Sequence, residues 1–140
     1  LEFRDYITIT QLARTWADAY DQKDPSCLRA ILAPTVHIDY GRVSATIPTR
    51  IADSESFIAE ILSPEHLGRE TLLTQHFLGQ PYVKSVSAEE IVVEWQQNAG
   101  HGRWDEDAAN SRGESTARSY IEQRYVKGEG PWKLAGLKPS

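Results

Sequence analysis

The sequence predicts an α+β fold: a cone-shaped, curved antiparallel or mixed β-sheet whose one face is covered by N-terminal helices. Three observations support this prediction. Early segments carry apolar residues three and four positions apart, later segments alternate with a period of two, and turn-forming residues separate the later segments. Helices that precede a run of consecutive strands are typical of α+β domains. We expect the helices and the sheet to enclose a pocket.

Three helices are predicted, over residues 8–20, 25–33 and 54–62. Thr8 or Thr10 can cap the start of the first helix, because both hydroxyls can accept a bond from a backbone N–H. Asp24 and Pro25 have the types preferred at the N-cap and the first position of the second helix. That helix must end before Pro34, since proline disfavours helical geometry in the residue before it.

Five strands are predicted after the second helix, and the last two are separated by the turn Gly128-Glu129-Gly130. A polar loop is predicted over Asp105–Gly113. The strand ranges are Val36–Tyr40, Leu72–Val83, Ile91–Arg103, Ser115–Lys127 and Trp132–Leu137.

Length and composition predict one domain over residues 1–140. The net charge is −5, and acidic and basic residues are interspersed along the chain. This pattern disfavours nucleic acid and anionic membranes as partners. No apolar run approaches the ~20 residues of a membrane span, so we expect a cytoplasmic protein. Cys27 is the only cysteine, which excludes an internal disulfide and a thiolate-rich zinc site.

Several residue types suited to acid–base chemistry fall where they could meet in the pocket. On the predicted strands, His76 shares a face with Thr74, and Ser119 shares a face with Ile121. His101 shares a face with Trp95 and Gln97, provided that no bulge intervenes across Gly100 and Gly102. Asp21 and Tyr40 are at the ends of a helix and a strand, where loops form a pocket mouth; Tyr20 precedes Asp21.

Simpler explanations exist for each of these residues. Taken alone, His76 is more often a buried structural histidine than a catalytic one, and Asp21 is most often a turn residue. A second alternative is a metal site made by His76, His101 and Asp21. No local ligand spacing supports that site, so we expect no metal there. Neither Ser119 nor Cys27 lies in a nucleophile motif, which disfavours nucleophilic catalysis.

Four motifs together resemble the family of scytalone dehydratase, the fungal melanin-pathway enzyme. This family belongs to the cone-fold group of nuclear transport factor 2 and ketosteroid isomerase. The resemblance covers nearly the whole chain and is carried by Trp16-Ala-Asp-Ala-Tyr-Asp-Gln-Lys-Asp24, Ala33-Pro-Thr-Val-His-Ile-Asp-Tyr40, Thr74-Gln-His-Phe-Leu-Gly79 and Lys133-Leu-Ala-Gly-Leu-Lys-Pro139.

The resemblance implies a cofactor-free loss of water from a β-hydroxy aromatic ketone. It implies that Tyr20 and Tyr40 hold a water against the substrate carbonyl. It also implies a homotrimer. The residues that match the polar catalytic set of the family are Asp21, His76, His101 and Ser119.

Two positions in the implied substrate wall depart from the family. Ile121 stands where the family has an asparagine, and Val43 stands where it has a phenylalanine. We therefore expect a dehydratase that acts on a less hydroxylated, polyketide-like aromatic ketone. The alternatives are an isomerase or cyclase that uses the same groups, and a non-catalytic binding module of the same fold.

Overall fold

The computed structural model describes residues 1–104 and 111–140. These residues form three helices and six strands. In chain order they are α1 (Phe3–Asp21), α2 (Pro25–Ile31), β1 (Leu32–Ile38), β2 (Arg50–Asp53), α3 (Ser54–Ile61), β3 (Leu72–Val86), β4 (Glu90–Trp104), β5 (Ser111–Val126) and β6 (Lys133–Pro139).

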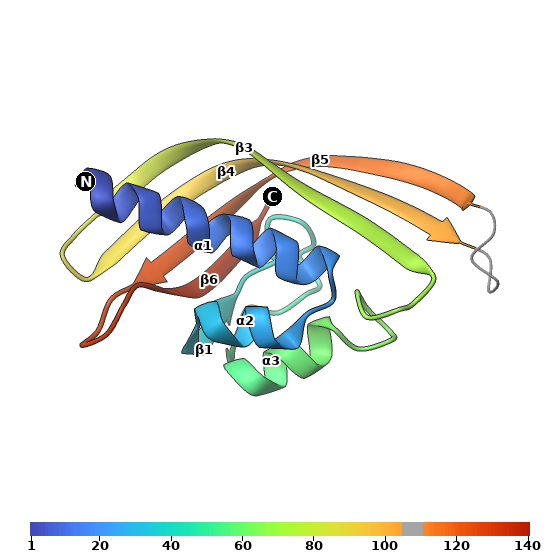
Figure 1. The fold of residues 1–140 in the computed structure, drawn as a ribbon, viewed down its shortest axis with the longest axis horizontal. Helices are drawn as coiled ribbons and strands as arrows, with labels where there is room; N and C mark the ends of the chain where they lie inside the picture. Colours follow the sequence, from blue (N-terminus) through green and yellow to red (C-terminus); the bar gives the residue numbers. More distant parts are fainter. Residues whose placement is uncertain (105–110) are drawn as a thin grey trace.

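The six strands form one mixed, curved sheet in the order β2-β1-β6-β5-β4-β3. The pair β1·β6 is parallel, and the other neighbouring pairs are antiparallel. Helix α1 crosses one face of the long strands, while α2 and α3 lie beside β1 (Figure 1). The described part of the sheet is open, because β2 and β3 lie at opposite edges. This arrangement confirms the predicted α+β fold with a curved mixed sheet.

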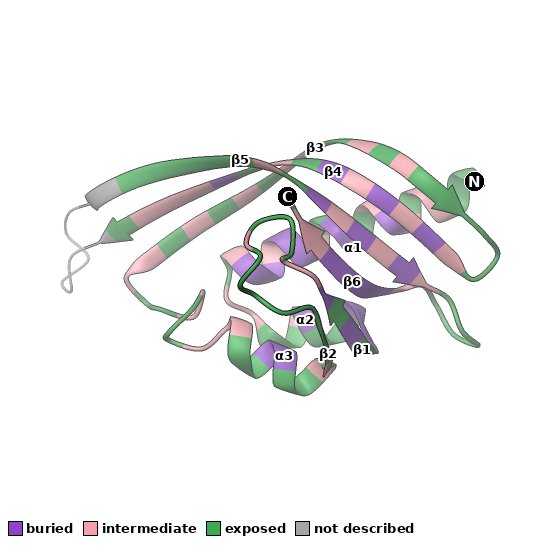
Figure 2. Ribbon diagram, turned by 180° about the vertical axis from the view of Figure 1, so that it is seen from behind, coloured by how far each residue is buried: buried purple, intermediate pink, exposed green. Residues whose placement is uncertain are grey.

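Alternation along β4 and β5 separates an inner face from an outer one (Figure 2). Val93 and Trp95 on β4, and Ile121 and Tyr125 on β5, are buried. The buried residues of α1, including Ile9, complete this core. Burying a side chain such as Ile9 stabilises the fold by roughly 1.5–3 kcal/mol. The core therefore fixes the position of α1 over the inner face.

The helices differ from the prediction mainly at the start of α1. This helix begins at Phe3, and its N-cap Glu2 makes no side-chain cap, so neither Thr8 nor Thr10 is a cap. Instead, their hydroxyls bond back to carbonyl groups of the preceding turn. A residue far along the sequence holds the first turn of the helix: the indole N–H of Trp132 donates to the carboxylate of Asp5 at 3.2 Å.

The second helix begins as predicted but ends earlier. The carboxylate of Asp24 accepts from the backbone N–H of Ser26 at 2.9 Å and of Cys27 at 3.1 Å, which confirms the cap. The helix ends at Ile31, and Pro34 lies inside β1, where the register with β6 shifts. Proline is tolerated at such an irregularity because no ladder bond is lost.

The strand boundaries also differ from the prediction. Strand β1 starts and ends earlier than predicted, and the four-residue β2 was not predicted. Residues 111–113 of the predicted polar loop belong to β5, and residues 105–110 lie outside the described residues. The hairpin between β5 and β6 is confirmed by their antiparallel pairing.

The long strand β3 contains a register shift between Leu78 and Pro81. Because β3 is an edge strand, Pro81 can lack its N–H without leaving a partner strand unpaired. The shift lies beyond His76, so the pairing of Leu72–Leu78 with β4 is regular. The alternation that places His76 on the inner face therefore holds.

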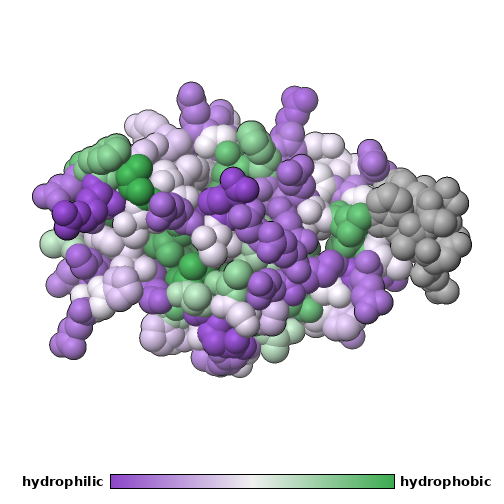
Figure 3. All heavy atoms as spheres, viewed as in Figure 1, coloured by the Kyte–Doolittle hydropathy of each residue, from purple (hydrophilic) through white to green (hydrophobic). Residues whose placement is uncertain are grey.

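The face that carries α1 is mainly hydrophilic, with scattered apolar side chains (Figure 3). Among the described residues, no helix is both long enough and apolar enough to cross a bilayer.

Candidate active site

Asp21 and His76 form the centre of the candidate site. The carboxylate Oδ1 of Asp21, at the end of α1, lies 2.7 Å from Nδ1 of His76 on β3. The His76 backbone N–H donates to Oδ2 of the same carboxylate at 2.9 Å. Both side chains are largely buried, with 8% of the His76 side chain and 16% of the Asp21 side chain exposed. One carboxylate therefore fixes both the ring and the main chain of His76.

The hydrogen bonds determine which form of Asp21 is present. Burial acts to raise its pKa, but bonds from the ring and backbone of His76, the charge of that ring and the hydroxyl of Thr74 hold the pKa below its usual value. Asp21 is thus an acceptor only, and Nδ1 of His76 must carry the proton. In the neutral ring this leaves Nε2 as a free base.

Two aromatic side chains of α1 enclose the His76 ring. Trp16 and Tyr20 each have a ring centroid 5.5 Å from that of His76, in edge-to-face geometry. Trp16 and Tyr20 also contact each other, with centroids 4.7 Å apart. These three rings come together because Trp16 and Tyr20 are one helical turn apart on the face that covers β3.

Tyr20 and Tyr40 both remain protonated phenols. Burial raises the pKa of Tyr20, and Tyr40 raises it further. Burial also raises the pKa of Tyr40, while Arg50 lowers it and Glu60 raises it. Two neutral phenols at neutral pH are hydrogen-bond donors, as a developing enolate oxygen requires.

A cavity of about 440 Å³ borders Tyr40. Its apolar wall includes Phe57 and Ile61 of α3, and its polar part includes Arg50 and Glu60, which form an ion pair at 2.7 Å. A cavity with an apolar wall and few polar groups is typical of small-molecule sites.

His101 lies near His76 on the neighbouring strand. Its register partners are Thr74 on β3 and Ser115 on β5, with no shift across Gly100 and Gly102. The ring centroids of His76 and His101 are 6.4 Å apart.

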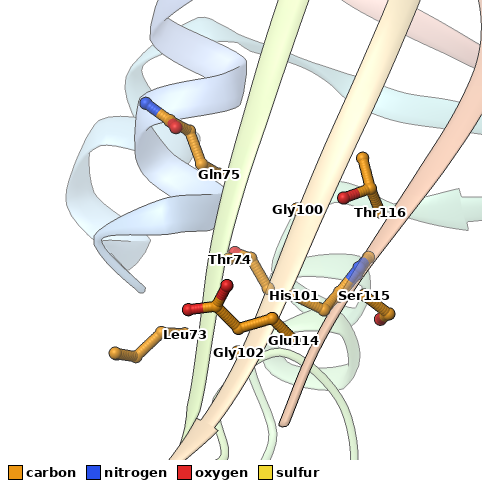
Figure 4. Close-up of a pocket in the computed structure, with 9 residues that line it drawn as sticks. All are labelled: Leu73, Thr74, Gln75, Gly100, His101, Gly102, Glu114, Ser115 and Thr116. Atoms are coloured by element: carbon orange, nitrogen blue, oxygen red, sulfur yellow. The ribbon is translucent and has the colours of Figure 1, made fainter. Parts of the chain in front are cut away.

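His101 also borders a 290 Å³ pocket (Figure 4). Strands β3, β4 and β5 form its walls, and the two glycines beside His101 add no side chains to it. His76 is not among the residues that line this pocket.

The structure does not bring every predicted residue to His76. Ser119 pairs with Gln97, two residues along β4 from the position opposite His76, and no hydrogen bond joins Ser119 to His76 in the described part of the chain. Ile121 is buried on the inner face, at 4% exposure, whereas Val43 is 58% exposed in the loop after β1. Among the described residues, the hydrogen-bond partner of the His76 ring is Asp21 and not Ser119.

The metal alternative is disfavoured by the donor geometry. Within residues 1–104 and 111–140, no group of three His, Cys, Asp or Glu side chains is arranged as metal ligands. Asp21 and Nδ1 of His76 are already bonded to each other.

Thr74 and Trp16 belong to the site but were not predicted as site residues. The Thr74 hydroxyl donates to Oδ1 of Asp21 at 3.0 Å. Its position two residues before His76 on the same strand face was a usable signal. A second usable signal was the spacing of Trp16 from Tyr20, one helical turn, although this spacing alone indicated only that Trp16 is a core residue.

Comparison with known proteins identifies the family. The sequence model of scytalone dehydratase matches residues 1–140. Dehydratase cfoI from Aspergillus candidus is 44% identical over 100% of this chain and 84% of its own. Scytalone dehydratase arp1 from Aspergillus fumigatus is 34% identical over 100% of this chain and 83% of its own.

Solved structures share the fold at low sequence identity. The Kfla4162 protein from Kribbella flavida is 17% identical, with a TM-score of 0.81 over 98% of this chain and 90% of its own. A protein of the NTF2-like family from Streptomyces avermitilis is 14% identical, with a TM-score of 0.76 over 99% of this chain and 97% of its own. The sheet and helices are therefore those of the cone fold. With its full-length match, the chain belongs to the scytalone dehydratase family and is a dehydratase.

Proposed function

We propose that this dehydratase removes water from a small hydroxylated aromatic ketone of the polyketide type, by acid–base catalysis without a cofactor. The observation that carries the proposal is the Asp21–His76 pair, enclosed by Tyr20, with no hydrogen bond to Nε2 of His76 among the described residues. The names of the relatives support loss of water as the reaction. Melanin or another secondary-metabolite pathway is the setting that the family suggests.

The first step is removal of a proton from the carbon beside the ketone. Nε2 of His76 accepts this proton, and the electron pair of the C–H bond moves toward the carbonyl oxygen. The phenols of Tyr20 and Tyr40 stabilise the enolate oxygen, directly or through a water. Because both phenols are held protonated, this stabilisation needs no further proton transfer.

The second step is expulsion of the β-hydroxyl group. The His76 imidazolium returns the proton to the leaving oxygen, the C–O bond breaks, and water departs as the new C=C bond forms. The carboxylate of Asp21 stabilises the imidazolium between the two steps. A positioned acid–base group of this kind contributes roughly 10²–10⁴-fold in rate.

The substrate wall favours a ligand with few hydroxyl groups. Ile121 places an apolar side chain on the inner face, and apolar residues of α3 line the cavity beside Tyr40. A buried apolar wall rejects an unpaired hydroxyl because that hydroxyl would lose its bonds to water. In this proposal His101 and Ser119 contact the substrate, and Val43, in the loop after β1, is a further residue of the substrate wall.

We also propose a homotrimer that assembles through the outer sheet face. That face exposes Phe77, Tyr82 and Tyr120, and some of its charged residues are paired within the chain, as Lys84 is with Glu122 at 2.9 Å. Aromatic side chains among satisfied charges suit an interface. Sedimentation equilibrium would test this, and a monomer at micromolar concentration would contradict it.

Mass-resolved product analysis tests the catalytic proposal. Wild type, His76→Ala and the control His37→Ala, whose histidine is exposed on β1, are incubated with hydroxylated tetralone and anthrone-type ketones. Loss of one water with wild type and His37→Ala, but not with His76→Ala, supports the dehydratase and the role of His76. Turnover without mass change would support the isomerase alternative, and equal turnover by His76→Ala would remove His76 from the chemistry.

A further inference from the structure

Lys23 occupies a strained position directly after α1. It is the single non-glycine residue with a positive φ, 54°, in the described part of the chain. The N–H of Lys23 donates to the carbonyl of Tyr20 at 3.2 Å, and that of Asp24 to Ala19 at 2.9 Å, which together close the helix. Glycine is the residue usually found at such a position, because it has no side chain to clash. Something other than backbone preference therefore favours lysine here.

The ammonium group of Lys23 supplies a reason. It donates to the carbonyl oxygens of Leu67 at 2.7 Å, Leu72 at 2.6 Å and Arg69. All three N–H bonds of the ammonium are thus used by the segment that leads into β3. An ammonium suits three converging acceptors, whereas the planar fork of arginine does not. Burial lowers the pKa of Lys23, and Glu70 opposes this change.

The lysine and the candidate base pair hold the same short piece of chain. Lys23 follows Asp21 by two residues, and Leu72, which Lys23 binds, precedes Thr74 by two. Asp21 in turn binds the hydroxyl of Thr74 and the ring and backbone of His76. The end of α1 is therefore fastened to the start of β3 by two neighbouring side chains, one cationic and one anionic.

We infer that Lys23 is a positioning residue for the reaction: its three carbonyl contacts set the start of β3 against α1, and so fix the geometry of Asp21 and His76. This inference rests on the proposed function for its kinetic consequence. Its structural consequence can be tested without a known substrate, because the pKa of the Asp21 carboxyl depends on the hydrogen bonds that this group accepts.

Four variants separate positioning from general stability. Lys23→Met removes the ammonium and keeps the strained backbone. Lys23→Gly also removes the ammonium but relieves the strain. Lys23→Arg keeps the charge without the three-point geometry. Lys133→Met is the matched control, because Lys133 donates to the carbonyl of Ala30 at 2.6 Å, away from the site.

The kinetic test is a double-mutant cycle between Lys23→Met and Asp21→Asn. We expect Lys23→Met, Lys23→Gly and Lys23→Arg each to lower kcat about tenfold, because small misplacements of catalytic groups are costly. KM should change less, and Lys133→Met should leave kcat unchanged. In the Asp21→Asn background, Lys23→Met should have little further effect. Additive effects in the cycle would overturn the inference.

The structural test is a carbon-13 NMR titration of the Asp21 carboxyl. In wild type its pKa lies below the usual value because of the bonds from His76 and Thr74, which outweigh the effect of burial. We expect this pKa to rise in Lys23→Gly, even if the backbone change leaves Tm near that of wild type. An unchanged Asp21 pKa in Lys23→Gly and Lys23→Met would overturn the inference. Absence of turnover in wild type would contradict only the proposed function.

Discussion

Asp21 accepts hydrogen bonds from both the ring and the backbone of His76, so one carboxylate fixes the imidazole and the strand that carries it. Each half of this contact has a separate consequence. The bond to Nδ1 leaves Nε2 free to act as a base, and the bond to the backbone joins α1 to β3. Substitutions of Asp21 should therefore change both catalysis and acid stability.

We expect Asp21→Asn to lower kcat by about 10²-fold, because an amide cannot stabilise the imidazolium by its charge. Steady-state kinetics with the ketone found by product analysis provides the measurement. Asp18→Asn is the matched control, since Asp18 lies one turn earlier on the same helix and pairs with the exposed Arg14. Equal kcat values for the two variants would contradict the role of Asp21.

Asp21 should also make stability depend on pH in the acid range. Burial opposes ionisation, but the bonds from His76 and Thr74 lower the folded-state pKa below that of the unfolded chain. The stabilisation is complete above the unfolded pKa of about 3.9 and is lost as pH falls through the folded value. Urea titrations of wild type and Asp21→Asn should therefore differ by a constant amount at neutral pH. The difference in unfolding free energy between the two proteins should shrink below about pH 4. A difference that grows below this pH would contradict a lowered folded-state pKa of Asp21.

Part of this site could be predicted from the sequence, because the helix period places Tyr20 on the apolar face of its helix and the strand period places His76 on one face with Thr74. The bond between Asp21 and His76 was not predicted, since it depends on how the end of the helix meets the strand. The fold class followed from the same periods. The parallel pairing of β1 with β6 could not be predicted, since those strands are far apart in the sequence. The start of α1 was missed because Phe3 is exposed and the helix has no side-chain cap; a bond from Trp132 holds it instead.

The buried phenol of Tyr20 should make the protein sensitive to alkaline pH. Burial and the neighbouring Tyr40 raise its folded-state pKa above the unfolded value of about 10. Its contribution is therefore present below pH 10 and is lost as pH rises further. We expect Tyr20→Phe to gain stability relative to wild type above about pH 10, as measured by urea unfolding at a series of pH values. A constant difference across that range would show that Tyr20 is ionised equally in both states.

Ile121 should control which hydroxylated ketones are accepted. Asparagine at this position, as in the family pattern, would offer a hydrogen bond to a substrate hydroxyl on the inner face, next to Trp95 of the neighbouring strand. We expect Ile121→Asn to raise kcat/KM for scytalone relative to a tetralone with fewer hydroxyl groups, by about tenfold. It should also cost about 2–4 kcal/mol of stability, because the side chain is buried.

Ile121→Val keeps the apolar wall and is the control for lost packing. The quantity to compare is the ratio of the kcat/KM values for the two ketones. If folded Ile121→Asn gives the same ratio as Ile121→Val, then Ile121 does not contact the substrate. A changed ratio in Ile121→Asn alone would place the hydroxyl-bearing ring of the substrate against β5. His76 would then act on the part of the ring system nearer to α1, because Asp21 and Tyr20 hold the imidazole against that helix.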